Sequence, residues 1–173
     1  MIYFSIYCLN WRFVGLAFHG KLCGLVMPDF ETKKLPLLTS TPCLKHLRRY
    51  LGKITLKEKY LPLAMLCQKE LTQYFNQKLS QFSVPLVLIG TPFQRSVWQI
   101  LLNIPYGQTL TYKALAQQLG KPKAPRAVAQ ACRANPLPIF IPCHRVIGKQ
   151  GLTGYRSGLK WKQYLLDLEG AYW

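Results

Sequence analysis

Apolar and polar residues alternate with a two-residue period at the start of the chain, which is typical of half-buried β-strands. One such stretch covers Ile2–Cys8 and a second covers Val14–Phe18, with a turn between them. The His19-Gly20 pair then leads into a third apolar stretch, Leu22–Met27. The pattern predicts a β-hairpin followed by a third strand.

Residues 28–90 show a different pattern, in which turn-forming and basic residues precede apolar residues at helical spacing. We expect a loop, a short helix around Leu44–Leu51, a further connection, and a helix from about Pro62 to Gln77. Val84–Ile89 is predicted to be a short apolar strand or an extended linker. The basic residues between Lys45 and Lys59 are expected to form a solvated face.

The second half carries the start and stop signals of several short helices. Thr91 can cap one helix, with proline following at its first position, and Thr111 can cap another that Gly120 closes. A third helix opens near Pro125 and reaches about Ala134, which makes the last two a helix-turn-helix candidate. The terminal helix is expected over Leu159–Leu168.

These elements predict two parts. The first, residues 1–88, is an α/β (α+β) N-terminal lobe with a small sheet. The second, residues 89–173, is a mainly helical C-terminal domain that contains the helix-turn-helix.

The charge balance is strongly basic, with 23 lysines and arginines, 6 acidic residues and a formal net charge of +17. The excess is shared, because 12 basic and 4 acidic residues precede Gly90 while 11 and 2 follow it. No acidic residue lies between Glu70 and Asp167. This balance favours a phosphate backbone or an anionic membrane over a small neutral ligand.

Neither a membrane helix nor a disulfide framework is expected. Polar and charged residues such as Arg12 and Lys21 interrupt the apolar N-terminus before it reaches the length that a bilayer requires. The six cysteines show no regular spacing and no C-x-x-C pair, so we expect reduced thiols in an intracellular protein.

The helix that opens near Pro125 is unusual because most of its side chains are alanine. Major-groove readers usually carry long polar side chains that touch base edges. A bare helix can instead approach a backbone closely, which suits the minor groove, and Arg126 could then act as a wedge in the base stack. A small-residue helix packed in the core would show the same pattern.

Cys143 and His144 are adjacent, with Arg145 next and apolar residues on either side. A thiol has a pKa of about 8.5 and reacts only as the thiolate, so an imidazole and nearby cations are what an attacking sulfur needs. A cysteine alone is more often a small buried apolar residue. In this cationic half, a nucleophilic cysteine suggests a polyanionic substrate, most simply nucleic acid.

The segment Ile141-Pro-Cys-His-Arg-Val-Ile147 resembles the active-site signature of the O6-alkylguanine-DNA alkyltransferases, also called methylated-DNA–protein-cysteine methyltransferases. Residues from about 68 to 170 match this family in register, whereas residues 1–60 match only loosely. The further matching motifs are Gly90-Thr-Pro-Phe-Gln94, Val97-Trp98, Ile104-Pro-Tyr-Gly107, Thr111-Tyr112, Pro122-Lys-Ala124, Arg126-Ala-Val128, Asn135-Pro136, Leu152-Thr-Gly-Tyr155, Leu165-Leu166 and Glu169-Gly170.

The resemblance implies direct DNA repair. Such a protein would bind the minor groove by its helix-turn-helix, flip the damaged guanine and move its O6-alkyl group irreversibly onto Cys143. O4-methylthymine would be a second substrate. By matching position, His144 would deprotonate the thiol through a water and Glu169 would orient the imidazole. Adjacent side chains in a strand point to opposite faces, so no direct contact between Cys143 and His144 is expected.

The resemblance also assigns roles to residues around the thiol. Asn135 would tie the active-site turn to the helix-turn-helix, and Tyr112 would contact the flipped nucleotide and donate a proton as guanine leaves. Arg126 would take the place of the extruded base. The expected contacts to the DNA backbone are Gln94, Lys113, Lys121 and Lys149. The expected lining of the alkylguanine pocket is Pro138, Tyr155 and Ser157.

No cofactor, metal or small-molecule methyl donor is expected. A thioether on Cys143 offers water no good leaving group, so the protein should act once. Cysteines and histidines of the first part lack a recognisable zinc spacing. The expected partner is double-stranded DNA carrying O6-alkylguanine, bound by a monomer in the cytoplasm, at the nucleoid of a prokaryote or in the nucleus of a eukaryote. Arg156-Ser157-Gly158 stands where many relatives have a glycine pair, which leaves the pocket width for bulky adducts open.

Two other function classes stay in view. A non-catalytic lesion-binding protein of the alkyltransferase-like type would replace the cysteine, and Cys143 argues against it. A cysteine hydrolase would need an oxyanion hole and would turn over, and the helix-turn-helix and cationic span would then go unused.

Overall fold

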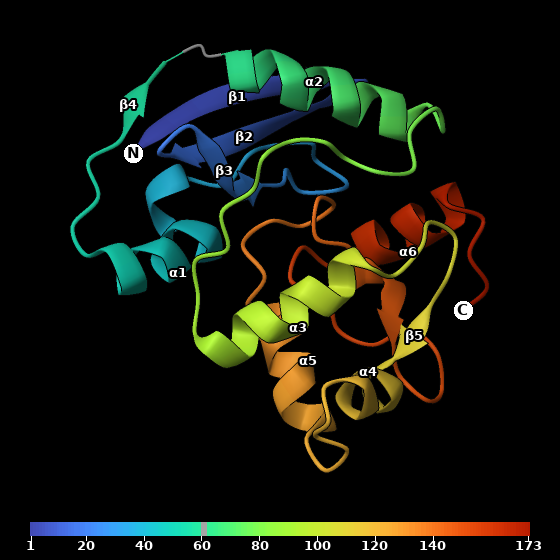
Figure 1. Ribbon diagram of the computed structural model, residues 1–173. Helices are drawn as coiled ribbons and strands as arrows, with labels where there is room; N and C mark the ends of the chain where they lie inside the picture. Colours follow the sequence, from blue (N-terminus) through green and yellow to red (C-terminus); the bar gives the residue numbers. More distant parts are fainter. Residues whose placement is uncertain (60–61) are drawn as a thin grey trace. The chain divides into compact units, whose positions relative to one another are not determined.

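The computed structural model describes residues 1–59 and 62–173, and the chain divides into two compact units, Met1–Ile89 and Gly90–Trp173 (Figure 1). Among the described residues, no helix has the length and apolar character needed to cross a bilayer.

The first unit is built on a four-stranded sheet with the order β3-β2-β1-β4. The strands are β1 (Ile2–Cys8), β2 (Trp11–Phe18), β3 (Lys21–Val26) and β4 (Lys57–Glu58). The first three pair antiparallel, which confirms the predicted hairpin and third strand. The short β4 pairs parallel with β1 and was not predicted, because two exposed residues in a basic connection carry no periodic signal.

Two helices cover opposite faces of this sheet. Phe13 stacks on Phe75 of α2 (Pro62–Phe75), whereas the next residue, Val14, belongs to the core cluster formed with α1 (Pro42–Leu51). Neighbouring residues in a strand point to opposite faces, so α1 and α2 lie on different sides of the sheet (Figure 1). A 3-10 turn, η1 (Leu38–Ser40), precedes α1.

The segment after α2 returns to the sheet in an extended form. The amide of Leu22 donates to Pro85 O at 2.9 Å, and the amide of Val87 donates to Leu22 O at 2.9 Å. This is an isolated parallel bridge to β3 and not a full strand, so the extended linker is the better of the two predicted forms. Buried Glu70 holds the start of the segment by accepting hydrogen bonds from the amides of Ser83 and Val84.

The second unit is mainly helical, as predicted. Its helices are α3 (Pro92–Leu102), α4 (Tyr112–Gln118), α5 (Pro125–Arg133) and α6 (Leu159–Leu168). Three further short elements are β5 (Leu110–Thr111), the 3-10 turn η2 (Cys143–Arg145) and β6 (Val146–Ile147). The parallel pairing of β5 with β6 was not predicted, since each strand has only two residues.

Helices α3 and α4 begin where side-chain caps satisfy their first amides. Thr91 accepts from the amide of Gln94, and the Gln94 side chain accepts in return from the amide of Thr91. Thr111 caps α4 by accepting a hydrogen bond from the amide of Ala114. Helices α3, α4 and α5 pack against one another, and Trp98 Nε1 donates to Ala131 O at 2.8 Å. The pair α4 and α5 therefore forms the predicted helix-turn-helix on the support of α3.

Candidate active site

The loop after α5 is shaped by the side chain of Asn135, which is 2% exposed. Its Oδ1 accepts from the amide of Leu137 at 2.9 Å, and its Nδ2 donates to Ile141 O at 2.9 Å. The same Nδ2 donates to Cys143 Sγ at 3.1 Å. Ile139 within the loop has φ 72°, a strained conformation for a β-branched residue. One amide thus fixes the loop and reaches the sulfur.

Cys143 opens the 3-10 turn η2, so the expectation that Cys143 and His144 lie in a strand is wrong. The reason is local, because Pro142 O accepts from the amide of Arg145 at 3.0 Å and closes a helical turn. The extended conformation begins only at Val146. In a 3-10 turn, neighbouring side chains still point in different directions. The hydrogen-bond donor that contacts the sulfur is Asn135.

The imidazole of His144, the residue that follows the cysteine, contacts the carboxylate of Glu169. His144 Nε2 lies 2.8 Å from Glu169 Oε1, and both side chains are fully buried. Arg145 donates two hydrogen bonds to the same carboxylate, from Nε at 2.8 Å and from Nη2 at 2.9 Å. Its Nη1 donates to Ile104 O at 2.6 Å. The amide of Gly107 donates to Glu169 Oε2 at 3.2 Å.

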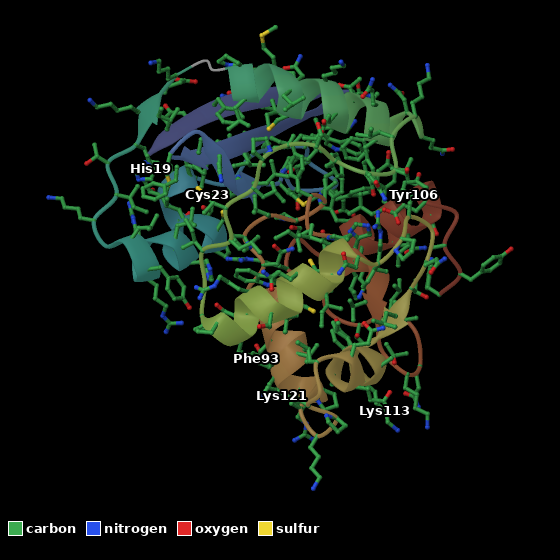
Figure 2. All side chains as sticks on the ribbon, in the orientation of Figure 1. His19, Cys23, Phe93, Tyr106, Lys113 and Lys121 are labelled. Atoms are coloured by element: carbon green, nitrogen blue, oxygen red, sulfur yellow. The ribbon has the colours of Figure 1, made fainter. Side chains whose placement is uncertain are left out.

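Gly107 is required at this position for two reasons. Its φ is +75°, and an added Cβ would lie 2.9 Å from the carbonyl oxygen of Glu169. The neighbouring Tyr106 hydroxyl donates to Leu168 O at 3.1 Å, and Figure 2 labels this side chain. The turn after α3 therefore closes directly on the end of α6.

The charges in this cluster determine the protonation states. Burial lowers the pKa of His144, although the hydrogen bond and charge of Glu169 oppose that effect. Burial alone would raise the pKa of Glu169, but hydrogen bonds and charge from His144 and Arg145 hold it well below its usual range. An ionised carboxylate can only accept hydrogen bonds, so His144 Nε2 carries the proton and donates a hydrogen bond to Glu169. Nδ1 is left with its lone pair, and this buried atom has no hydrogen-bond partner among the described residues.

The thiol itself rests in its neutral form. Burial raises the pKa of Cys143, while the hydrogen bond from Asn135 and the positive charges of Lys162 and Arg156 lower it. Arg145, the cation next in sequence, is already bound to Glu169. The cations that act on the sulfur come instead from α6 and the loop before it. A base is therefore needed to form the thiolate.

Lys162 is fully buried, and its Nζ donates to Val146 O at 2.6 Å and Thr153 O at 2.8 Å. Burial lowers its pKa to about 8. It also lies 5.9 Å from the centroid of the Tyr112 ring. Lys162 thus ties β6 to the loop that follows it, beside the cysteine.

A cavity of about 320 Å³ lies next to this cluster. Its lining residues are Tyr112, Ala129, Gln130, Arg133, Thr153, Gly154 and Tyr155. A smaller space of about 10 Å³ shares four of these walls and reaches Cys143, Cys132 and Arg156. The larger volume lies at the lower end of the range for small-molecule pockets, about 300–1,000 Å³. The sulfur therefore lines a small space that shares walls with a cavity large enough to hold a flat ring.

Helix α5 forms one wall of this cavity and turns a face to solvent. Val128, Ala131 and Cys132 are buried, whereas Ala127 is exposed and Ala129 lines the cavity. Close packing in a core thus explains Ala131, but it does not explain Ala127 or Ala129. The exposed long side chains of α5 are Arg126, Gln130 and Arg133.

Three comparisons with known proteins agree on the family. The family model described as "6-O-methylguanine DNA methyltransferase, DNA binding domain" matches residues 92–171. The constitutive methylated-DNA–protein-cysteine methyltransferase of Bacillus subtilis is 48% identical over 115 residues, which cover 65% of this chain and 70% of that protein. The crystal structure of Mycobacterium tuberculosis OGT in complex with DNA matches 98% of this chain and 93% of its own, with 34% identity and a TM-score of 0.78. The chain belongs to the methylated-DNA–protein-cysteine methyltransferase family.

A second relative is more similar over a shorter stretch. The methylated-DNA–protein-cysteine methyltransferase of Methanosarcina barkeri is 55% identical over 102 residues, which cover 58% of this chain and 65% of that protein. The chain thus spans less than two thirds of that relative's length in this match.

Of the five predicted catalytic residues, Cys143 and Tyr112 line the small cavity. Asn135 donates to Cys143 Sγ, and His144 and Glu169 form a pair with each other. Of the predicted pocket residues Pro138, Tyr155 and Ser157, only Tyr155 lines the larger cavity and the small space beside it. Pro138 is buried in the loop, and Ser157 is half-buried beside Arg156.

The residues predicted to contact DNA differ in their exposure to solvent. Lys113, Lys121 and Lys149 are exposed, and Figure 2 shows the first two projecting outward from α4 and from the turn before α5. Gln94 is half-buried, and its side-chain oxygen is engaged in the cap of α3.

The sequence did not predict the ion pair between Arg145 and Glu169. It also did not predict that Arg156 and Cys132 line the small space beside Cys143. One signal was available for the first, because an acidic residue in so basic a region is expected to have a cationic partner. All six cysteines are buried thiols. Within the described ranges, no three His, Cys, Asp or Glu side chains form a group that could hold a metal.

Proposed function

We propose that this protein repairs double-stranded DNA by transferring the alkyl group of an O6-alkylguanine, and also of O4-methylthymine, irreversibly to its own Cys143. The observation that carries the proposal is the position of the sulfur. The sulfur lines a small space that shares four walls with a ring-sized cavity, and it accepts a hydrogen bond from Asn135. The next residue in the chain, His144, forms a buried imidazole–carboxylate pair with Glu169.

The proton would leave the thiol towards His144. Its Nδ1 is the unprotonated nitrogen, and a water between Nδ1 and the sulfur could carry the proton across. Glu169 would stabilise the imidazolium that forms, and Arg145 holds that carboxylate ionised and in place. Asn135 and the cationic side chains nearby would stabilise the thiolate.

The thiolate would then attack the alkyl carbon. The sulfur–carbon bond forms as the carbon–O6 bond breaks, and the electron pair stays with the guanine. Tyr112 lines both cavities and could supply a proton to the departing base, although burial raises the pKa of its hydroxyl. A thioether gives water no good leaving group, so one protein would be consumed for each lesion, with no cofactor or methyl donor.

The damaged base has to leave the duplex to reach this sulfur, because stacked bases do not expose the alkyl carbon to in-line attack. The small exposed residues of α5 would let this helix approach the minor groove, with Arg126 entering the stack. Exposed Lys113, Lys121 and Lys149 would pair with phosphates. We expect the protein to act as a monomer.

The test uses a duplex with a single O6-methylguanine in fivefold excess over protein. Intact mass should show one added methyl per protein, reached in one phase and then constant. Cys143→Ser should bind the duplex and gain no mass. Continued loss of the lesion beyond one equivalent would indicate a turning-over hydrolase, and binding without any mass change would indicate a non-catalytic lesion-binding protein.

A further inference from the structure

The small space beside Cys143 has a cationic wall. Arg156 and Arg133 both line it, and none of its lining residues is acidic. The guanidinium of Arg156 is held in place, because its Nη1 donates to Ala134 O at 3.2 Å and to Asn135 O at 3.1 Å. These carbonyls follow the last turn of α5, so the charge is anchored to the helix that lines the cavity.

The acidic residues of the second unit do not line this space. The second unit contains only two acidic residues, Asp167 and Glu169. Glu169 is bound to His144 and Arg145, and exposed Asp167 accepts a hydrogen bond from Trp173 Nε1 at 3.2 Å. Lys162 adds a second positive charge that acts on Cys143. The end of the cavity next to the sulfur is therefore electropositive.

The space is also narrow. Its volume of about 10 Å³ is close to the minimum that holds one water molecule. A methyl carbon approaching the sulfur would fill it, and any longer alkyl group would extend along walls that include Arg156, Arg133 and Tyr155. The chemistry of these walls then acts on the atoms beyond the first carbon.

We propose that Arg156 is a specificity-determining residue, which makes the protein accept alkyl groups that end in a carboxylate in preference to neutral groups of the same size. The proposal rests on the proposed function, since it names a substrate class for the same sulfur. An opposite charge in a partly enclosed cavity attracts through space, so the effect needs no direct hydrogen bond to the guanidinium.

The reaction is the same substitution with a charged group. The Cys143 thiolate forms a bond to the CH₂ carbon of an O6-carboxymethyl group, and the carbon–O6 bond breaks with its electron pair on guanine. The guanine takes up one proton, and the protein carries S-carboxymethylcysteine. The carboxylate is unchanged throughout and remains beside Arg156.

The experiment compares three duplexes that differ only in the O6 group, which is carboxymethyl, its neutral isostere carbamoylmethyl, or methyl. Single-turnover rates are measured by intact mass for wild type, Arg156→Met, Arg156→Lys and Lys160→Met. The readout is the ratio of the carboxymethyl rate to the carbamoylmethyl rate within each variant. Changes in folding, active fraction and DNA affinity act on both rates alike and cancel in this ratio.

We expect Arg156→Met, which keeps the length but not the charge, to lower the ratio by roughly fivefold, the effect of a partly exposed ion pair. Arg156→Lys should restore most of it. Lys160→Met removes an exposed charge that lines neither cavity, and its ratio should equal that of wild type. Raising the salt concentration should lower the wild-type ratio.

An unchanged ratio in Arg156→Met would overturn the inference. If that variant does not fold, a wild-type ratio that is independent of salt would overturn it equally. Failure of wild type to accept methyl from the third duplex would instead contradict the proposed function.

Discussion

Replacing Glu169 by Gln should destabilise the second unit strongly, because this carboxylate is the counter-ion of a buried cluster. It accepts hydrogen bonds from His144, Gly107 and two nitrogens of Arg145. Glutamine keeps one acceptor oxygen but places an NH₂ group among donors. Arg145, which is 5% exposed, then loses its buried counter-ion. Removing one partner of a buried ion pair costs about 3–5 kcal/mol.

That loss is a large part of the stability of a domain, which is typically about 5–15 kcal/mol. It can be measured by urea unfolding followed through tryptophan fluorescence, because Trp98 and Trp161 of this unit are fully buried. The matched control is Asp167→Asn, which removes the same charge from an exposed position on α6. We expect that control to change the stability by less than about 0.5 kcal/mol.

The difference between wild type and Glu169→Gln should also depend on pH. The folded-state pKa of Glu169 lies well below that of a free glutamate, about 4.3. Its contribution is therefore complete above the unfolded pKa and is lost as the pH falls from about 4 towards the folded pKa. A loss below about 1 kcal/mol at pH 7, or an equal loss in Asp167→Asn, would refute the reasoning.

Three further predictions concern single side chains. Asn135→Ala should slow transfer at pH 7 by about tenfold and shift the pH–rate profile to higher pH, because the thiolate loses a hydrogen bond; a slower reaction with an unshifted profile would count against this. Burial lowers the pKa of Lys162 to about 8, so above that pH the unfolded chain binds a proton that the folded chain does not, and stability rises with pH. The stability of wild type minus that of Lys162→Met should therefore increase between pH 8 and about 10, and a flat difference in urea unfolding would contradict it. Arg126→Ala should slow repair in a duplex more than reaction with the free O6-alkylguanine base, because only the duplex requires base extrusion; equal losses on both substrates would exclude that role.

Much of the secondary structure follows from short-range chemistry that a sequence displays. The alternation over Ile2–Cys8 and Val14–Phe18 predicts the hairpin. Burial alternates over part of β1, whereas Phe13 to Ala17 of β2 are all buried because helices cover both faces of the sheet. The caps Thr91 and Thr111 predict where α3 and α4 begin. The two-residue strands β5 and β6 could not be predicted in this way, because their pairing joins segments far apart in the chain.

The site residues were likewise predicted in part from the sequence. The Cys143-His144 pair and its family resemblance pointed to Glu169 as the partner of the imidazole, and the structure places the two in contact. The cationic environment of the sulfur was expected, but its source was not. Arg156 reaches the site because it donates to Ala134 O after α5, and Lys162 of α6 because it donates to Val146 O of β6. No local pattern encodes these tertiary contacts.

The central claim is that one sulfur accepts carbon from a base in DNA, and peptide mapping tests it most directly. The protein should be incubated with a duplex whose O6-methylguanine carries a ¹³C-labelled methyl group, digested, and searched for the label on every cysteine-containing peptide. We predict one equivalent of label on the peptide that contains Cys143 and none on the peptide that contains Cys132, the other thiol of the cavity wall. Label on Cys132 or another residue, or unlabelled protein after complete loss of the lesion, would contradict the claim.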